Sequence, residues 1–281
     1  MKKNLFLAIA GMLLLASCKQ QEESGQQQEE SCQQQEEWTA LYNGEDLTGW
    51  DMFLGSSLGP DFDHLAEAAT IEGVFSIVEI DGANVIRISG EINGSLATRE
   101  EFENYHIRLV FKWGEEVFSR RNSGLLYHSF GDFGVAFGTW MPNIELQLMH
   151  QNLGDTYLMA NTACETPAVL NPETSQYVFT PDADLLPFGE HASGRMIRKS
   201  HDNEKPLGEW NVVDLYCYGT TAVHVVNGET VMVNYNTGVF EGGQVNPLTR
   251  GKIQLQSEGA ELFVKSIDIR PIHSFPSEVL P

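Results

Sequence analysis

Apolar and polar residues alternate along much of the chain beyond residue 38, with the period of two that is typical of a β-strand with one buried face. The segment from Tyr105 to Trp113 shows the pattern best, with an apolar face made of Ile107, Leu109, Phe111 and Trp113. Its opposite face is formed by His106, Arg108 and Lys112. The segment from Trp210 to Tyr218 alternates in the same way, so both segments are predicted to be strands.

A hairpin and several shorter strands extend this pattern. Asn227-Gly228 separates Ala222–Val226 from Thr230–Val233, and it predicts a two-residue hairpin because a type I′ turn needs positive φ at both central positions. Further strands are predicted at Val74–Ile80, Asn84–Ser89, Leu125–His128, Ile144–Met149, Ile253–Ser257 and Glu261–Arg270. Helical periodicity is confined to His64–Ala69. The sequence therefore predicts an all-β domain, a two-sheet antiparallel β-sandwich of the jelly-roll type.

The interval 160–209 differs from the rest of this domain. It is polar, contains proline and is weakly patterned, so it is predicted to be a long irregular insertion over the sheet or along its rim. Such insertions in compact domains are usually functional.

The start of the chain has the pattern of an export signal. Residues 1–17 combine the positive Lys2 and Lys3 with an apolar core from Leu5 to Leu15, about half the length that spans a bilayer. Leu15-Ala16-Ser17-Cys18 resembles a lipobox, which implies cleavage before Cys18 and lipid attachment there. More than one acyl chain would give lasting membrane attachment. The alternative is an ordinary secretory signal with an incidental cysteine.

Residues 18–37 follow as a predicted tether, and residues 38–281 as a single β-sandwich domain. The tether repeats Gln and Glu and has no apolar residues to bury, which is typical of disorder. Cys32 within it is either a free thiol or an intermolecular bridge. The lipobox and the family described below together lead us to expect a cell-envelope protein, lipid-anchored at the outer membrane or facing the periplasm.

Charge and cysteine content narrow the partners. The chain carries 17 basic and 39 acidic residues for a net charge of −22, and only six of the acidic residues lie in the tether. So negative a body repels nucleic acid and anionic lipid and suits neutral ligands such as sugars. Cys164 and Cys217 are the cysteines of the body, and either both are buried thiols or they form a bridge.

Candidate chemistry centres on the predicted strand at Ile144–Met149. Glu145 and Gln147 project from the same face, where a carboxylate beside an amide can take a proton and hold a hydroxyl. His150 follows three residues later, and a bulge could bring it to the same side. Trp140, Tyr127 and His128 are candidate sugar contacts, because sugar rings are bound by aromatic rings and a few polar groups. The alternative is that Glu145 and Gln147 form the solvated face of an ordinary strand.

Six phrases, in order along the body, resemble the DUF1080 family, also called the 3-keto-disaccharide hydrolase domain, which has a concanavalin A-like sandwich. They are Trp38–Trp50, Asn122-Ser123-Gly124, Glu145-Leu146-Gln147, Gly208-Glu209-Trp210-Asn211, Asn227-Gly228 and Gly251–Gln256. The chain departs from the family's pattern at His150, where relatives often carry Asp, and at Glu258, where they often carry His.

The resemblance implies cleavage of glycosidic bonds in 3-keto-glycosides by elimination and hydration, or by hydrolysis. Such chemistry needs a base, for which Glu145 or His150 is the candidate, and an acid for the leaving group. Gln147 and Asn122 are candidates for holding hydroxyls, and Arg121 or Lys205 for the developing oxyanion. No cofactor is expected, although His128, Glu145 and His150 could instead gather a divalent cation.

Other functions on the same fold stay open at this stage. The strand Glu145-x-Gln147-x-x-His150 is distantly similar to the Glu-x-Asp-x-x-Glu strand of sandwich glucanases but lacks their second carboxyl group. Ordinary two-carboxylate hydrolysis is therefore not expected in this protein. A non-catalytic glycan-binding lipoprotein would use the same face and tether equally well. A structural envelope protein would fit the tether but not the polar and aromatic strand.

Overall fold

The computed structural model describes residues 37–280. The predicted signal peptide, the lipid-anchored Cys18, Cys32 and nearly all of the tether lie outside this range, so they stay predictions. Within it, no helix is long and apolar enough to cross a membrane.

The first of two packed layers, which we call the back sheet, contains seven strands in the order β3–β4–β19–β7–β15–β16–β17, all antiparallel. Their bounds are β3 Phe75–Ile80, β4 Ala83–Ile88, β7 Tyr105–Asn122, β15 Asn211–Tyr218, β16 Thr221–Val226, β17 Glu229–Glu241 and β19 Arg250–Pro271. The short β1 (Thr39–Ala40) adds to one edge of β19. The β16–β17 turn has positive φ at Asn227 and Gly228, as the hairpin prediction requires.

The second layer, the front sheet, runs β2–β5–β19–β8–β9–β10–β14 and is also antiparallel. Its further strands are β2 Trp50–Leu54, β5 Gly94–Thr98, β8 Gly124–Ser129, β9 Asn143–Gln147, β10 Thr156–Met159 and β14 Met196–Ile197. β19 belongs to both layers, and its register against β7 shifts around Glu258 and Gly259, where it passes from one layer to the other. β6 (Phe102–Glu103) pairs with the first two residues of β19, Arg250 and Gly251.

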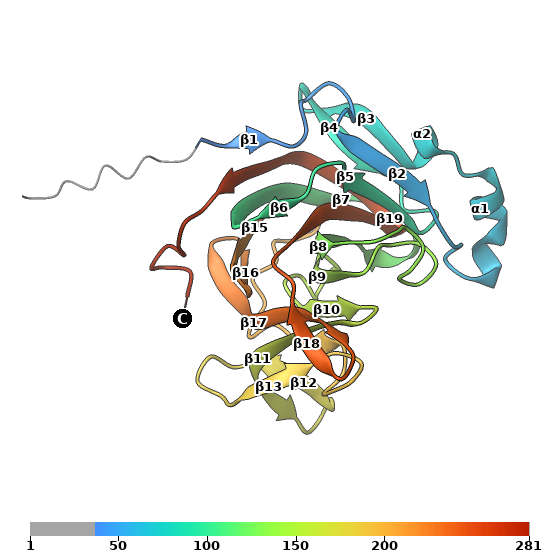
Figure 1. The fold of residues 1–281 in the computed structure, drawn as a ribbon. Helices are drawn as coiled ribbons and strands as arrows, with labels where there is room; N and C mark the ends of the chain where they lie inside the picture. Colours follow the sequence, from blue (N-terminus) through green and yellow to red (C-terminus); the bar gives the residue numbers. More distant parts are fainter. Residues whose placement is uncertain (1–36, 281) are drawn as a thin grey trace, which may run out of the picture. The chain divides into compact units, whose positions relative to one another are not determined.

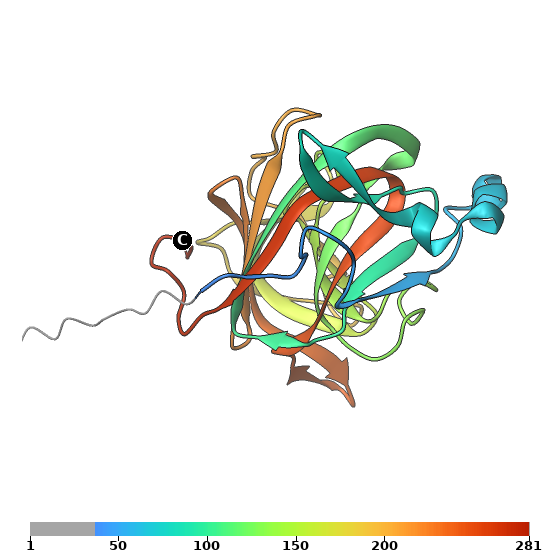
Figure 2. The same ribbon diagram turned by 90° about the horizontal axis from the view of Figure 1, so that it is seen from above.

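The predicted two-sheet sandwich is confirmed, and alternation explains its core. Ile107, Leu109 and Phe111 of β7 are fully buried, as are Leu125 of β8 and Leu146 of β9. Each such side chain contributes roughly 1.5–3 kcal/mol when it leaves water. Figure 1 shows the long, curved β7 and β19 arching over β8, β9 and β10, and Figure 2 shows the same arrangement from above.

Among the described residues, helix is confined to one edge, beside β2 (Figure 1). The 3-10 helix η1 spans Pro60–Phe62, α1 spans Asp63–Ala68 and α2 spans Ile71–Val74. The helix predicted at His64–Ala69 is thus present one residue earlier.

The prediction of an irregular insertion at 160–209 is wrong for its first half. β11 (Thr162–Asn171), β12 (Gln176–Phe179) and β13 (Leu185–Phe188) lie there and form a small lobe with the end of β17 and with β18 (Gln244–Pro247). Alternation is weak in this segment because Pro167 lies inside β11 and several of its buried residues are small or polar.

Both cysteines of the body are free and buried, so the alternative of a Cys164–Cys217 bridge is not realised. Cys164 lies on β11 of the lobe and Cys217 on β15 of the back sheet. Burial raises the pKa of each thiol to about 12. Both therefore act as small apolar side chains.

Candidate active site

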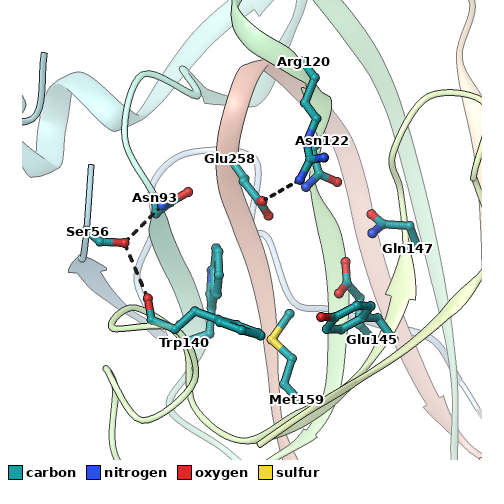
Figure 3. Close-up of a pocket in the computed structure, with 11 residues that line it drawn as sticks. Ser56, Asn93, Arg120, Asn122, Trp140, Glu145, Gln147, Met159 and Glu258 are labelled. Atoms are coloured by element: carbon teal, nitrogen blue, oxygen red, sulfur yellow. Dashed lines mark hydrogen bonds and ion pairs between the residues drawn. The ribbon is translucent and has the colours of Figure 1, made fainter. Parts of the chain in front are cut away.

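A cavity of about 340 Å³ opens on the face of the front sheet that points away from the core. Figure 3 shows polar side chains from several strands pointing into it. It is lined by Ser56, Asn93, Arg120, Asn122, Phe137, Trp140, Glu145, Gln147, Tyr157, Met159 and Glu258.

Strand alternation places Glu145 and Gln147 in this cavity, as predicted for one face of β9. Their neighbours Ile144 and Leu146 point into the core and are fully buried. Tyr157 pairs directly with Glu145 across β9 and β10, so its ring lies on the same face. The Gln147 amide is oriented by its Oε1, which accepts the backbone N–H of Met149 at 3.0 Å.

Glu145 is buried in the cavity floor. Its side chain is 2% exposed, and its Oε1 has no hydrogen-bond partner within residues 37–280. Loss of water raises its pKa well above the ordinary value for a glutamate, and the charges of Glu258 and Asp155 add to this, while Arg120 opposes it. A carboxyl group in such a place holds its proton and suits a general acid.

Glu258 brings a second carboxyl group into the cavity from the bend of β19. Its Oε1 lies 3.6 Å from Arg120 Nη2. Burial raises the pKa of Glu258, while Arg120 and a hydrogen bond from Asn122 lower it. The two carboxyl groups thus differ in surroundings, because Glu258 has the Arg120 guanidinium and the Asn122 amide beside it, whereas Glu145 Oε1 has no hydrogen-bond partner among residues 37–280. This difference favours an ionised Glu258 next to a neutral Glu145.

Aromatic rings and a polar corner complete the walls. The Trp140 indole is fixed by a 3.0 Å hydrogen bond from its Nε1 to the Gly94 carbonyl oxygen. Phe137 is half exposed, and its ring lies 6.4 Å from Trp140 and 6.3 Å from Tyr157. On the far side Asn93 donates to Ser56 Oγ at 3.1 Å (Figure 3). Rings beside a few polar groups are typical of sugar sites.

A second cavity of about 250 Å³ adjoins the first and shares four lining residues with it: Arg120, Asn122, Gln147 and Tyr157. Arg198 stands on its other side, where its Nη1 donates to Asn152 at 2.7 Å and to Asp155 at 2.6 Å. The two cavities form one groove that runs past the carboxyl groups.

Two predicted sugar contacts lie in the core instead. Tyr127 is on the buried face of β8, with its hydroxyl 3.2 Å from His224 Nε2. His128 is 1% exposed and has a φ of 51°. Its ring packs against Tyr105 and Tyr127 because the ladder between β8 and β19 is irregular here. Neither residue lines either cavity.

Three further predicted site residues also miss the groove. β9 ends at Gln147, and the His150 ring turns away to Glu204, with 3.0 Å between Nδ1 and Oε1. Arg121 points to the opposite side of β7, where its Nη2 donates to the Gly114 carbonyl oxygen at 3.4 Å. Lys205 lies on an exposed loop. Asn122, Gln147, Trp140 and Glu145 are the predicted residues that the cavity brings together.

The three residues predicted for a divalent cation are not brought together, since His128 is in the core and His150 is paired with Glu204. Among residues 37–280 no three His, Cys, Asp or Glu side chains are grouped to hold a metal ion. The second carboxyl group, absent from β9, is supplied by β19 instead. Two-carboxylate hydrolysis was not expected because β9 alone lacks a second carboxyl group, and this reason no longer holds once Glu258 is included.

Sequence reasoning missed Glu258 and Arg120 as site residues. Glu258 stood out only as a departure from the family's pattern, and a departure at a polar position is the one signal that could have found it. Arg120 was passed over for Arg121, because alternation along β7 cannot be extended through its irregular end to say which of the two faces the cavity.

A family model, described as the 3-keto-alpha-glucoside-1,2-lyase-like domain, matches residues 37–270. No curated protein matches the chain.

Solved structures with a similar fold share little sequence with it. One is a candidate glycosyl hydrolase from Parabacteroides distasonis, with 21% identity over 84% of this chain and 94% of that one, and a TM-score of 0.46. The carbohydrate-binding module CBM66 from Bacillus subtilis has 8% identity over 79% and 96%, and a TM-score of 0.43. A beta-glucanase from Bacillus licheniformis has 11% identity over 84% and 98%, and a TM-score of 0.41.

Proposed function

The chain belongs to the family of 3-keto-alpha-glucoside-1,2-lyase-like domains, and from this premise we propose that it cleaves 3-keto-glycosides by elimination, with Glu258 as base and Glu145 as acid. Membership in the family supports a role in carbohydrate chemistry. The observation that carries the assignment is the pair of carboxyl groups in one cavity, one buried with its pKa raised by the loss of water and one beside a guanidinium.

The reaction begins at the ketone. A C3 carbonyl acidifies the proton on C2, so Glu258 removes that proton and the electron pair moves to the C3 oxygen as an enolate. The enolate then re-forms the carbonyl and expels the glycosidic oxygen from C1, leaving a C1–C2 double bond. Glu145 gives its proton to the departing oxygen, which leaves as an alcohol. Water added across the double bond then yields the free 3-keto sugar.

The remaining cavity residues have supporting roles. Arg120 is the cation nearest the base and suits the enolate oxygen, a role first predicted for Arg121 or Lys205. Asn122 and Gln147 supply amides for sugar hydroxyls, and Trp140 with Tyr157 supplies ring faces. The adjoining cavity gives the departing group a place in the same groove.

Product analysis on glycosides offered both native and oxidised at C3 tests this proposal. We expect cleavage of the oxidised set only, with exchange of the C2 hydrogen for solvent deuterium. Glu258→Gln and Glu145→Gln should each lower kcat by about 10²–10⁴-fold. A nitrophenyl leaving group needs no proton, so it should restore cleavage in Glu145→Gln but not in Glu258→Gln. His150→Ala is the control, since His150 does not reach the cavity and should be dispensable.

Each contrary result has a definite meaning. Cleavage of native glycosides with the C2 hydrogen retained would replace elimination by two-carboxylate hydrolysis. Binding of sugars without turnover of either set would leave a non-catalytic glycan-binding protein. Activity lost in His150→Ala and kept in Glu258→Gln would overturn the choice of base.

A further inference from the structure

Gln256 is a buried glutamine whose side chain has no partner. It lies on β19 next to the cavity floor and is 1% exposed. Neither its Oε1 nor its Nε2 has a hydrogen-bond partner among residues 37–280. Leaving a buried polar group unpaired destabilises a fold, so an isolated amide is not expected here.

Gln254, two residues earlier on the same face of β19, shows what an ordinary buried glutamine does. Its Oε1 accepts from Ser95 Oγ at 2.7 Å and from the Met141 backbone N–H at 3.3 Å. Its Nε2 donates to Ser129 Oγ at 2.7 Å. Both polar atoms of the Gln254 side chain therefore have hydrogen-bond partners. Those of Gln256 have none in the described part of the chain, which raises the question of the side chain nearest to them.

The space beside Gly124 identifies the side chain that lies near Gln256, which is Glu145. A Cβ added at Gly124 would lie 2.4 Å from Glu145 Oε1 and 2.7 Å from Gln256 Oε1. Gly124 has no positive φ, so its lack of a side chain provides space and not a special backbone conformation. Glu145 Oε1 and Gln256 Oε1 therefore both border the space that a side chain at Gly124 would fill, above the backbone of β8.

Both atoms that border this space are oxygens, and both are buried without a hydrogen-bond partner among residues 37–280. Two acceptor oxygens repel each other in a dry site unless one of them carries a proton. A glutamine oxygen does not carry one, whereas a carboxyl oxygen can. The pair is then complementary, because the acid O–H donates to the amide oxygen.

We infer that Gln256 is a positioning residue whose Oε1 accepts a hydrogen bond from the protonated carboxyl of Glu145 and so keeps this carboxyl in its acid form, aimed from the floor of the cavity. This inference rests on the proposed function only in the role of Glu145, which is to protonate the departing oxygen; the pairing of Glu145 with Gln256 does not depend on it. The groups that face Glu145 from other elements act together with it: Glu258 on β19 and Asp155 before β10 favour the neutral form, and Arg120 on β7 opposes it.

Infrared difference spectroscopy on the full-length protein without substrate tests the pairing directly. The protonated-carboxyl band of Glu145, identified by its loss in Glu145→Gln, is followed as the pH rises. Gln256→Met keeps the volume but removes the acceptor, so the pH at which the band disappears should fall by about half to one unit. Gln254→Met is the matched control on the same strand and should leave that pH unchanged.

Gly124→Ala is an independent probe that retains Gln256, and it serves if Gln256→Met does not fold. The new Cβ forces the carboxyl of Glu145 away, so the band should again disappear at lower pH, and the alkaline limit of any activity should follow it. The inference would be overturned if the band disappeared at the same pH in Gln256→Met as in the wild type. If only Gly124→Ala folds, the same result in that variant would overturn it. A rise would mean that the amide instead donates to an ionised Glu145. Since the band is read without turnover, failure of the proposed reaction would be seen separately.

Discussion

At the scale of single residues, the cavity holds groups that a stable core would avoid. Glu145 has a raised pKa because it is out of water, and Glu258 has a raised pKa despite Arg120. Each therefore ionises more easily in the unfolded chain than in the folded one. Such a carboxyl lowers the stability of the fold increasingly as the pH rises above its ordinary pKa, and the loss becomes constant above the raised folded value.

Glu145→Gln should accordingly make the protein more stable at neutral pH. The advantage should be absent near pH 4.5, where the unfolded chain also begins to hold its proton. It should then grow by up to about 1.4 kcal/mol per pH unit as the pH rises. Chemical denaturation of wild type and variant between pH 4.5 and 8 measures this difference. The exposed Glu173, changed in the same way, is the control, and a difference that stays flat with pH would count against a raised pKa.

At the scale of elements, alternation predicted most strands, because a sandwich buries one face of each and the period of two records it. The bend of β19 could not be predicted in this way. Ile253–Ser257 and Glu261–Arg270 are each regular, so they were predicted as two strands, and the joint between them had no pattern. Glu258 lies at that joint, which is why the second carboxyl group escaped notice.

The joint depends on Gly259, and a matched pair of variants isolates its role. Gly259 has a φ of +93°, and an added Cβ would lie 2.4 Å from Ser119 Oγ and 2.7 Å from the Arg120 carbonyl oxygen. Gly228 has a similar φ of +91° with nothing within 4 Å. Gly228→Ala should cost about 1–2 kcal/mol from backbone strain alone.

Gly259→Ala should cost about 1–3 kcal/mol more than Gly228→Ala, because the clash adds to the strain. It should also weaken cleavage, since Arg120 and Glu258 flank the clash. Urea unfolding and a kcat measurement on both variants check this. Equal losses of stability would show that the β7–β19 joint accommodates a methyl group freely.

At the scale of the whole molecule, the site draws on β7, β9, β10, β19 and the segment that carries Phe137 and Trp140. Sequence alone predicted Asn122, Gln147 and Glu145 because they lie within family phrases, and it predicted Trp140 because sugar rings are bound by aromatic side chains. It misplaced Tyr127 and His128 because it could not tell which aromatic residues the two sheets bury. Tyr127 and His128 instead belong to the core, and burial of His128 there affects how the stability of the fold depends on pH.

His128 should make the molecule sensitive to acid. Desolvation lowers its pKa from 6.5 to about 3 in the folded state, so the folded protein favours the neutral form of His128. Above pH 6.5 the folded and unfolded chains both hold it neutral. As the pH falls from 6.5 towards 3, only the unfolded chain gains the proton, and stability should drop by about 1.4 kcal/mol per pH unit from this residue. Buried His224, with its pKa lowered to about 4, acts in the same direction.

His128→Phe removes this contribution and keeps an aromatic ring between Tyr105 and Tyr127. Its free energy of unfolding should therefore fall less steeply than that of the wild type between pH 6.5 and 4, by about 1.4 kcal/mol per unit. The slope is the measured quantity, because the substitution also changes packing at every pH. The same change at the exposed His64 controls for the loss of a histidine. Parallel slopes for His128→Phe and wild type would mean that the ring takes up its proton inside the core or that the core opens to water above pH 4.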